Sequence, residues 1–322
     1  MASSRTGPVS LSRSFCPSSG ALHSYFRAEM GPCYTSTRML KSEINDPVWF
    51  FDLEWVPDAA GAVRLFDLPP ETTELEAMQR LWSETKGYDP IECPRPFVKY
   101  ALSRVVSIAF LSRRVVYVDG VRKTEFGLHS LPKLPADGEV PTEAEILSQF
   151  LHWVGIREPQ LVGFNSLDSD LQVLIQRSVI NEVRAESFCK RPDKPWNGRD
   201  YFDSKNSEWH LDLMQRFSYG AMKPKLNEMA RLSGFPGKID AQGDQVVDMW
   251  LDGRVREIVE YNQIATLNTY LLWMRVANFT CKIRDDHYIE EQDDFREFLE
   301  SEAEKPTGGH IQRFLDVWDS IV

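Results

Sequence analysis

The run VWFFDLEWV, residues 48–56, constrains the fold of this 322-residue chain more than any other stretch. A half-buried strand alternates apolar and polar positions, whereas this run carries large apolar side chains on both faces. Such a strand is expected in an α/β sheet that is covered on both sides. Two carboxylates, Asp52 and Glu54, nevertheless interrupt the run. Side chains two residues apart on a strand point the same way, so both should face one spot, where a proton or a cation must compensate their charge.

Composition limits the possible classes of protein. The formal net charge of −11 argues against a protein that coats nucleic acid through a basic surface, although it leaves room for an enzyme that holds a strand locally. No run of about 18 apolar residues exists, which predicts no membrane span. The five cysteines are scattered and include no C-x-x-C pair, which favours a cytoplasmic protein.

Residues 1–40 are rich in serine and show no clear periodicity. They are expected to be a disordered tail, or an upstream extension of a protein whose working start is Met39. A transit peptide is less favoured, because prolines would break the apolar stripe of its amphipathic helix.

Capping and turn signals divide the rest of the chain into strands and helices. The expected strands are 48–55, RVVSIAFLS, RRVVYVDG, KTEFGLHSL and the short QLVGFN. The expected helices are 72–87, 141–155, SDLQVLIQRSVI, KLNEMARLSGF, DQVVDMWLDG, a long helix over about 254–279 and two acidic helices over 284–322. A basic and aromatic segment over 185–208 is expected to be irregular. This order implies a mixed sheet with helices on both faces.

Two further stretches carry side chains of interest. In LVGFNSLDSDLQVL, 161–174, a strand passes into a helix whose first turn holds Asp168 and Asp170. Acids in a first turn favour the helix dipole and need no other role. In the helix VEYNQIATLNTYLLWMR, 259–275, Tyr261 and Ala265 share one face because they are four residues apart. Taken alone, this is a core helix that carries a tyrosine.

The stretches described above belong to a set of five segments that follow one another along the chain: FFDLEW, VGFNSLDSDLQVL, WHLDLM, LSGFPGK and EYNQIATLNTYLL. Together they resemble the tyrosine-containing (DEDDy) subgroup of the DEDD 3′–5′ exonucleases, most of all the predicted exonucleases similar to the proofreading domain of family B DNA polymerases. The resemblance covers about 48–275. It implies a ribonuclease H-like α/β fold, a three-layer α/β/α arrangement with a mixed central sheet, and two Mg²⁺ or Mn²⁺ ions. We therefore expect an exonuclease domain over 41–280, followed by an acidic helical extension over 281–322.

The resemblance also assigns roles. Asp52, Glu54 and Asp170 match the metal-binding acids, and Tyr261 matches the tyrosine that positions the attacking water. The second motif of the family reads G-F-N-S-x-x-F-D-L, which places Asp170 rather than Asp168 at the ligand position. The residues expected to contact the substrate are Leu53, Asn165, Ser166, Lys194 and Trp196. The last two belong to a basic and aromatic loop, 188–202, which is either a single-strand binding element or an ordinary solvated loop.

The chain departs from the family at the fourth acid, which should stand four residues after Tyr261, where Ala265 lies instead. The neighbours Glu257, Glu260 and Asn268 are not placed to replace it. Three explanations stay open: an engineered inactive variant, a natural pseudo-exonuclease that still binds 3′ ends, or a slow enzyme with one well-held metal.

The expected function is hydrolysis of phosphodiester bonds at nucleic acid 3′ ends, with single-stranded DNA favoured and the rate weakened by Ala265. The rivals are a module that binds 3′ ends without turnover and an α/β protein whose acids are incidental.

Overall fold

The computed structural model describes residue 40 and residues 44–136, 138–203, 205–218, 222–239 and 243–321. The expected tail over 1–40 lies outside these residues, apart from Leu40. One compact unit spans Arg38–Val322, so the C-terminal helices belong to the same unit as the sheet. Every helix in the described part is too short or too polar to cross a membrane.

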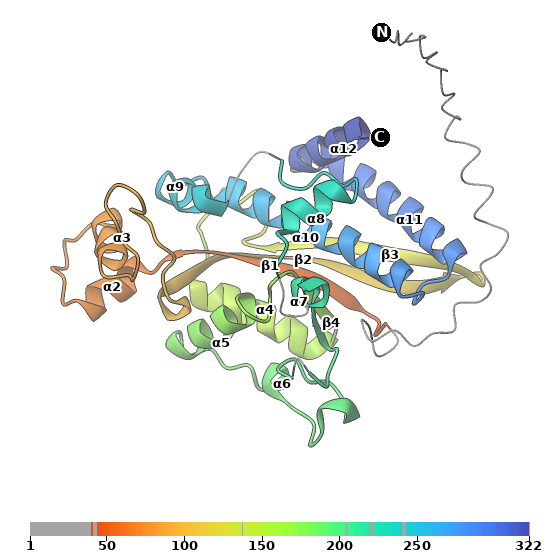
Figure 1. Ribbon diagram of the computed structural model, residues 1–322, viewed down its shortest axis with the longest axis horizontal. Helices are drawn as coiled ribbons and strands as arrows, with labels where there is room; N and C mark the ends of the chain where they lie inside the picture. The colour runs from red at the N-terminus through yellow and green to blue at the C-terminus, as the bar shows by residue number, and fades with distance from the viewer. Residues whose placement is uncertain are drawn as a thin grey trace, which may run out of the picture. The chain divides into compact units, whose positions relative to one another are not determined.

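The described residues form a mixed five-stranded sheet in the order β3-β2-β1-β4-β5 (Figure 1). Its strands are β1 (Val48–Pro57), β2 (Ser103–Val118), β3 (Val121–Leu131), β4 (Gln160–Gly163) and β5 (His210–Asp212). The first three strands pair antiparallel, and β4 and β5 continue the sheet parallel to β1. The hairpin predicted at Asp119-Gly120 joins β2 to β3.

The prediction of two separate strands before that hairpin is wrong. β2 is one strand of 16 residues that passes through Arg113 and Arg114 without a turn. Both arginines find acidic partners, Glu291 for the buried one and Glu125 for the exposed one, so the strand continues where the sequence indicates a break.

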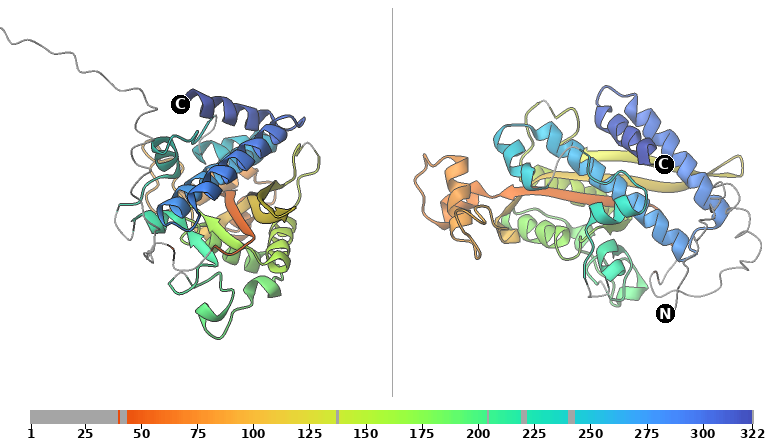
Figure 2. Two further views of the ribbon diagram at one scale, coloured as in Figure 1. Left: turned by 90° about the vertical axis from the view of Figure 1, so that its right-hand side faces the viewer. Right: turned by 45° about the horizontal axis from the view of Figure 1, so that its top comes forward.

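Helices cover both faces of the sheet (Figure 2). One face carries α4 (Glu143–Arg157) and α5 (Asp170–Ile180), and the other carries α8 (Leu226–Leu232), α10 (Val255–Phe279), α11 (Asp285–Ala303) and α12 (Gly309–Ile321). The shorter elements are α2 (Ala59–Leu65), α3 (Glu74–Ser83), η1 (Tyr100–Leu102), α6 (Glu186–Cys189), η2 (Pro195–Asn197), α7 (Leu213–Ser218), η3 (Gly243–Gln245) and α9 (Val246–Leu251). The predicted three-layer α/β/α fold with a mixed central sheet is confirmed.

Local sequence explains where the main helices begin. The hydroxyls of Thr73 and Thr142 each accept a hydrogen bond from a backbone N–H of the first turn, and the carboxylate of the glutamate three residues later accepts one from the backbone N–H of the threonine. These capping boxes satisfy backbone donors that a helix start leaves unpaired. Helix α2, which was not predicted, is capped by Asp58, whose carboxylate accepts a hydrogen bond from the backbone N–H of Gly61 at 2.9 Å.

Strand β1 lies at the centre of the core, as its composition predicts. The ring of Phe50 packs edge-on against Tyr270 and Trp273 of α10, at centroid distances of 5.1 and 5.2 Å. The ring of Phe51, on the opposite face of the strand, lies 5.9 Å from that of Phe150 in α4. Both faces of β1 are therefore covered by apolar side chains.

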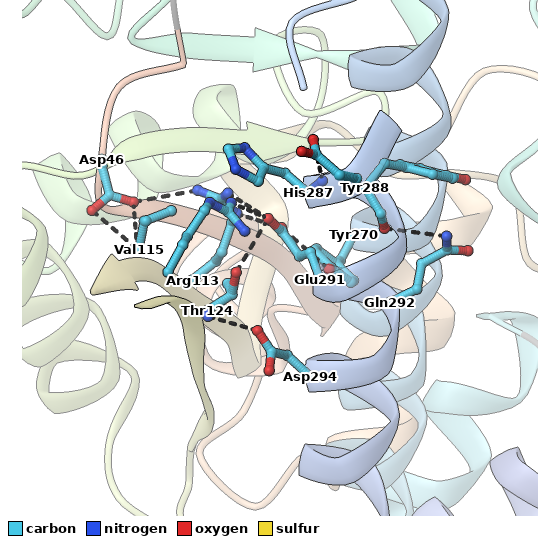
Figure 3. A network of polar contacts seen from close by, with 12 residues as sticks. Asp46, Arg113, Val115, Thr124, Tyr270, His287, Tyr288, Glu291, Gln292 and Asp294 are labelled. Atoms are coloured by element: carbon cyan, nitrogen blue, oxygen red, sulfur yellow. Dashed lines mark hydrogen bonds and ion pairs between the residues drawn. The ribbon is translucent and has the colours of Figure 1, made fainter. Parts of the chain in front are cut away.

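A buried network of charges fixes α11 to the sheet (Figure 3). The guanidinium of Arg113 donates to both carboxylate oxygens of Glu291, at 2.6 and 2.7 Å, and Arg122 donates to the same carboxylate at 2.8 Å. Burial acts to raise the pKa of Glu291, but the hydrogen bonds and charges of the two arginines outweigh it and hold the pKa below its ordinary value. Each charge is therefore compensated inside the protein.

Replacing Glu291 with alanine should lower the free energy of unfolding by about 3–5 kcal/mol, because it leaves buried arginine charge without a partner. Urea unfolding of Glu291→Ala measures the change. The matched control is Glu297→Ala on the same helix, where an exposed carboxylate lies 3.5 Å from Lys123. An exposed pair of this kind contributes at most about 1 kcal/mol. Equal losses from the two variants would contradict the importance of the network.

The same carboxylate predicts a dependence of stability on pH. Its pKa in the folded state lies below the value of about 4.3 that a glutamate has in an unfolded chain. Its contribution is therefore complete above that value and is lost as the pH falls through the folded pKa. The difference in free energy of unfolding between the protein and Glu291→Gln should shrink as the pH falls below about 4.3. A difference that stays constant under acid would refute this expectation.

Candidate active site

Strand β1 extends beyond its parallel neighbour β4, and this difference in length creates the site. The parallel ladder joins Val48–Phe50 to residues 160–162, and β4 ends at Gly163. Further along β1, the backbone N–H of Leu53 donates to the Oδ1 atom of Asp170 at 3.1 Å. The first residue of α5 thus takes the place of a strand partner, and it brings a carboxylate beside Asp52 and Glu54.

The turn between β4 and α5 is held by Asp212, at the end of β5. Its buried carboxylate accepts hydrogen bonds from the backbone N–H groups of Asn165 and Leu167, at 2.9 and 3.0 Å. Asn165 adopts a left-handed backbone conformation with φ of 65°. Sequence reasoning missed Asp212: the segment WHLDLM was recognised as part of the family pattern, but no role was given to its acid. The structure makes Asp212 a positioning residue for the turn that carries Asp170.

Seven residues singled out in the sequence line one cavity of about 610 Å³: Asp52, Leu53, Glu54, Asn165, Asp170, Tyr261 and Ala265. They come from β1, the β4–α5 junction and α10. Asp168 is not among the described residues that line this cavity; its carboxylate lies 2.7 Å from the ammonium of Lys223. The geometry therefore separates the two acids of the second motif and brings Asp170 to the shared cavity.

Helix α10 presents Tyr261, Ala265 and Asn268 to the cavity. The amide of Asn268 donates to the carbonyl of Gly237 at 3.0 Å and accepts from its N–H at 2.9 Å. Gly237 has φ of +65°, and a Cβ at this position would lie 2.4 Å from the Oδ1 atom of Asn227. Glycine is thus required in this loop, which sets the Lys238 ammonium 5.3 Å from the centre of the Tyr261 ring.

Burial and neighbouring carboxylates disfavour the charged forms of Asp52, Glu54 and Asp170. Burial raises the pKa of Glu54 to about 8, the charge of Asp170 adds to the effect, and that of Lys238 opposes it. Burial, followed by the charges of Asp170 and Glu54, raises the pKa of Asp52 well above its ordinary value. Burial also raises the pKa of Asp170 to about 6, against hydrogen bonds that include one from the Ser169 hydroxyl at 2.6 Å. Raised carboxylate pKa values in a shared cavity are typical of functional sites.

No acid in the described part of the chain replaces the one missing at position 265. Glu260 pairs with Arg256 at 2.8 Å, and Glu257 pairs with Arg254 at 3.1 Å. Glu228 lines the cavity, but it caps α8, where its carboxylate accepts the backbone N–H of Lys225 at 3.0 Å. The amide of Asn268 is occupied by Gly237. Apart from the capping Glu228, the acids that line the described cavity are therefore Asp52, Glu54 and Asp170, where the resemblance leads us to expect a fourth at position 265.

Three of the residues expected to contact substrate are not among the described residues that line the cavity: Ser166, Lys194 and Trp196. Ser166 is fully buried, and its hydroxyl lies 2.9 Å from the Nε2 atom of His210. Gly163 permits this packing, because a Cβ there would lie 2.4 Å from the serine hydroxyl. The predicted substrate contact of Ser166 does not fit this burial. Lys194 and Trp196 lie on the loop after α6, where the ammonium is 5.8 Å from the indole ring.

Sequence reasoning also missed three lysines that line the cavity, namely Lys223, Lys225 and Lys238. They flank α8, on segments that showed no charge pattern in the sequence. LSGFPGK contains the last of them, but nothing in a G-K dipeptide indicates that its ammonium lies near two carboxylates. The cavity is therefore lined by both carboxylates and ammonium groups.

The acids supply oxygen donors of the kind that Mg²⁺ and Mn²⁺ prefer. Burial, together with the neighbouring carboxylates, raises the pKa values of Asp52 and Glu54, and a bound cation would favour their charged forms. Within the described residues, however, no three His, Cys, Asp or Glu side chains are arranged to hold a metal ion by themselves. Mg²⁺ usually keeps several waters and binds through one or two carboxylates together with substrate oxygens, so the donor set fits a shared, substrate-completed site.

Comparison with known proteins places this geometry in a family. Residues 95–318 match the family described as predicted 3′–5′ exonucleases related to the exonuclease domain of PolB. The match includes the C-terminal helices and begins after β1, so it does not cover Asp52 and Glu54. No curated protein matches the chain.

Among solved structures, the chain is similar to the family B DNA polymerase from the hyperthermophilic archaeon Pyrobaculum calidifontis. The sequence identity is 15% and the TM-score is 0.37, and the alignment covers 82% of this chain but 27% of the polymerase. The chain thus spans about a quarter of that polymerase's length. Because the family match extends over well more than half of its residues, the chain belongs to the predicted 3′–5′ exonucleases related to the exonuclease domain of PolB.

Proposed function

We propose that the protein is a metal-dependent 3′–5′ exonuclease of the DEDDy type, whose rate is reduced by Ala265. One observation carries the proposal: three acids from distant parts of the chain line one cavity together with Tyr261. A chain whose acids were incidental would have no reason to gather like charges in a half-buried place, because doing so destabilises the fold.

Asp52, Glu54 and Asp170 are the residues that would hold Mg²⁺ or Mn²⁺. Such ions, when bound, lower the pKa of water and neutralise charge on a phosphate. The protein itself positions the reactants. The hydroxyl of Tyr261 orients the attacking water, and the ammonium of Lys238 attracts the non-bridging oxygens of the scissile phosphate. Asp212 contributes indirectly, because it holds the turn that positions Asp170.

We also propose a substrate and the residues that contact its terminal nucleotide. Single-stranded DNA is the favoured substrate, because the cavity is lined by lysines and by the aromatic ring of Trp55, which suit an unpaired strand. A cytoplasmic location remains the expectation from the sequence. Asn165 and Leu53, which line the cavity beside the acids, are the proposed contacts to the terminal nucleotide.

A second function is favoured by a specific observation, the alanine at position 265. Alanine offers no oxygen, and the neighbouring acids Glu257 and Glu260 are paired elsewhere. A module that binds 3′ ends without hydrolysing them would keep the cavity and its lysines and lose turnover. It predicts binding that weakens with salt, with no product after long incubation.

Ala265→Asp should raise the rate of 3′-end hydrolysis by at least about 100-fold, since loss of even the outer partners of metal ligands costs 10- to 100-fold. A 3′-labelled single-stranded oligonucleotide with Mg²⁺ or Mn²⁺ reports the rate. Asp52→Asn in the Ala265→Asp background should abolish the gain, and this control excludes a contaminating nuclease. Absence of cleavage by Ala265→Asp with either metal would reject the exonuclease.

Metal binding can be tested without activity by comparing the two acids of the second motif. At a concentration 100 times the dissociation constant, a bound cation raises the free energy of unfolding by about 2.7 kcal/mol. Thermal unfolding should show this stabilisation by Mn²⁺ in the protein and in Asp168→Asn, and its loss in Asp170→Asn. Asparagine can still accept the hydrogen bond from Leu53, so the variant should fold. Equal stabilisation of both variants would remove Asp170 from the metal site.

A further inference from the structure

We infer that Trp55, Phe97 and Tyr100 form an aromatic platform that stacks on unpaired bases of the strand whose 3′ end lies in the carboxylate cavity. The inference rests on the proposed function, and it names the part of the site that makes the substrate single-stranded. It moves the single-strand contact away from the loop over 188–202, where the sequence indicated it.

The three rings form one cluster near the carboxyl end of β1. The ring centroids of Trp55 and Phe97 are 6.5 Å apart, those of Trp55 and Tyr100 are 6.4 Å apart, and those of Phe97 and Tyr100 are 5.5 Å apart. All three pairs meet edge to face. Trp55 follows Glu54 directly, after an irregularity in the β1–β2 register, and the other two rings precede β2. Ring contacts of this kind hold the cluster in a fixed shape.

The platform is exposed where a base could reach it. The side chain of Phe97 is 64% exposed, although the neighbouring residues Pro96 and Val98 are buried. Leaving a phenylalanine in water forgoes the free energy that its burial would provide. A rigid, exposed aromatic ring that adjoins a polar cavity is therefore more consistent with a binding surface than with incomplete packing.

The platform is continuous with the carboxylate cavity. Trp55 itself lines that cavity. Burial raises the pKa of Tyr100, the charges of Asp170 and Asp168 raise it further, and the charge of Lys223 lowers it. The ring of Tyr100 therefore lies close enough to these three residues to feel their charges. A strand whose last phosphate lies at the acids can thus place its preceding bases on the aromatic rings.

Cations line the same cavity although the protein as a whole is acidic. The formal net charge is −11, yet Lys223, Lys225 and Lys238 all line this cavity. Lysines gathered against the overall charge of a molecule attract an anionic ligand to that place. Cations for the backbone and aromatic rings for the bases are the two components of sites that bind single-stranded nucleic acid.

The loop over 188–202 is a weaker candidate because its arginines are engaged within the protein. The guanidinium of Arg191 donates to the carboxylate of Asp200 at 2.9, 3.0 and 3.1 Å, and Arg199 pairs with Glu158 at 2.8 Å. Asp200 is buried, and its carboxylate also accepts hydrogen bonds from the backbone N–H groups of Phe202 and Asp203, so Arg191 pairs with a carboxylate that is itself held in place. Trp196 remains exposed, but none of these residues lines the cavity in the described part of the chain.

Fluorescence anisotropy of a 5′-fluorescein-labelled oligothymidylate, measured in EDTA so that hydrolysis does not contribute, tests the platform. Phe97→Ala should weaken binding roughly 10-fold, as loss of one base–aromatic stack does, and Phe97→Tyr should retain it. Phe279→Ala, which removes a ring that is 73% exposed at the end of α10, is the matched control and should bind as the unmodified protein does. Lys225→Gln should lower the slope of binding against salt by about 0.7, the value for one phosphate contact to a single strand.

A second oligonucleotide, whose last few nucleotides lack their bases, separates stacking from other effects. The protein should bind it more weakly by the same factor, and Phe97→Ala should cause no additional loss. The platform is refuted by unchanged binding of Phe97→Ala, by a larger loss from Trp196→Ala, or by absence of binding to either oligonucleotide. If binding depends on Phe97 while Ala265→Asp cleaves nothing, the exonuclease fails and the platform stands.

Discussion

The hydrogen bond between the backbone of Leu53 and the carboxylate of Asp170 joins the two halves of the site. β4 stops at Gly163, and a buried backbone N–H left without an acceptor would cost the free energy of a lost hydrogen bond. Asp170 supplies the acceptor at 3.1 Å, and it thereby lies beside Asp52 and Glu54. The crowding of acids is thus built into the completion of the sheet. Asp212 secures the arrangement by fixing the turn that leads to α5.

The position of α10, which contributes Tyr261 and Ala265 to the cavity, is fixed by packing in the hydrophobic core. Helix α10 lies between the sheet and the C-terminal helices, and Phe50 on one side and Phe295 on the other contact its Tyr270. Glu291 adds a buried charge pair between α11 and β2. The direction in which Tyr261 and Ala265 face is therefore determined by the core.

Much of this could be predicted from local sequence, because the signals are local. The doubly apolar run of β1, the capping boxes at Thr73 and Thr142 and the turn at Asp119-Gly120 act within a few residues. That β2 is a single strand could not be predicted, because the buried Arg113 in its centre is compensated by residues distant in sequence, chiefly by Glu291, 178 residues away. A strand as short as β5 has too few residues to show a period.

The acids of the site could be predicted because five segments in one order resemble a known family, whereas the cations could not, since none of them has an assigned role in those segments. Lys238 enters the cavity through a loop whose course depends on the φ of Gly237 and on the amide of Asn268, and neither is visible in the sequence around the lysine. The expectation that Lys194 and Trp196 in the loop over 188–202 contact the substrate also came from sequence neighbours alone. A sequence shows that cations and aromatic rings are neighbours, but it does not show that Arg191 and Arg199 already have partners.

If Ala265 stands where an ancestral protein had the acid that the proposed function implies, the exchange has an evolutionary consequence. Removing a fourth acid from a site that already holds three carboxylates lowers the electrostatic repulsion there. The core residues that hold α10 do not change. An acid at position 265 would thus favour catalysis and lower the stability of the fold. Where selection for turnover relaxes, a lineage gains a sturdier fold by losing that acid, and it keeps an intact scaffold for recognising strand ends. Reversion needs one codon, so such a lineage stays one step from an enzyme.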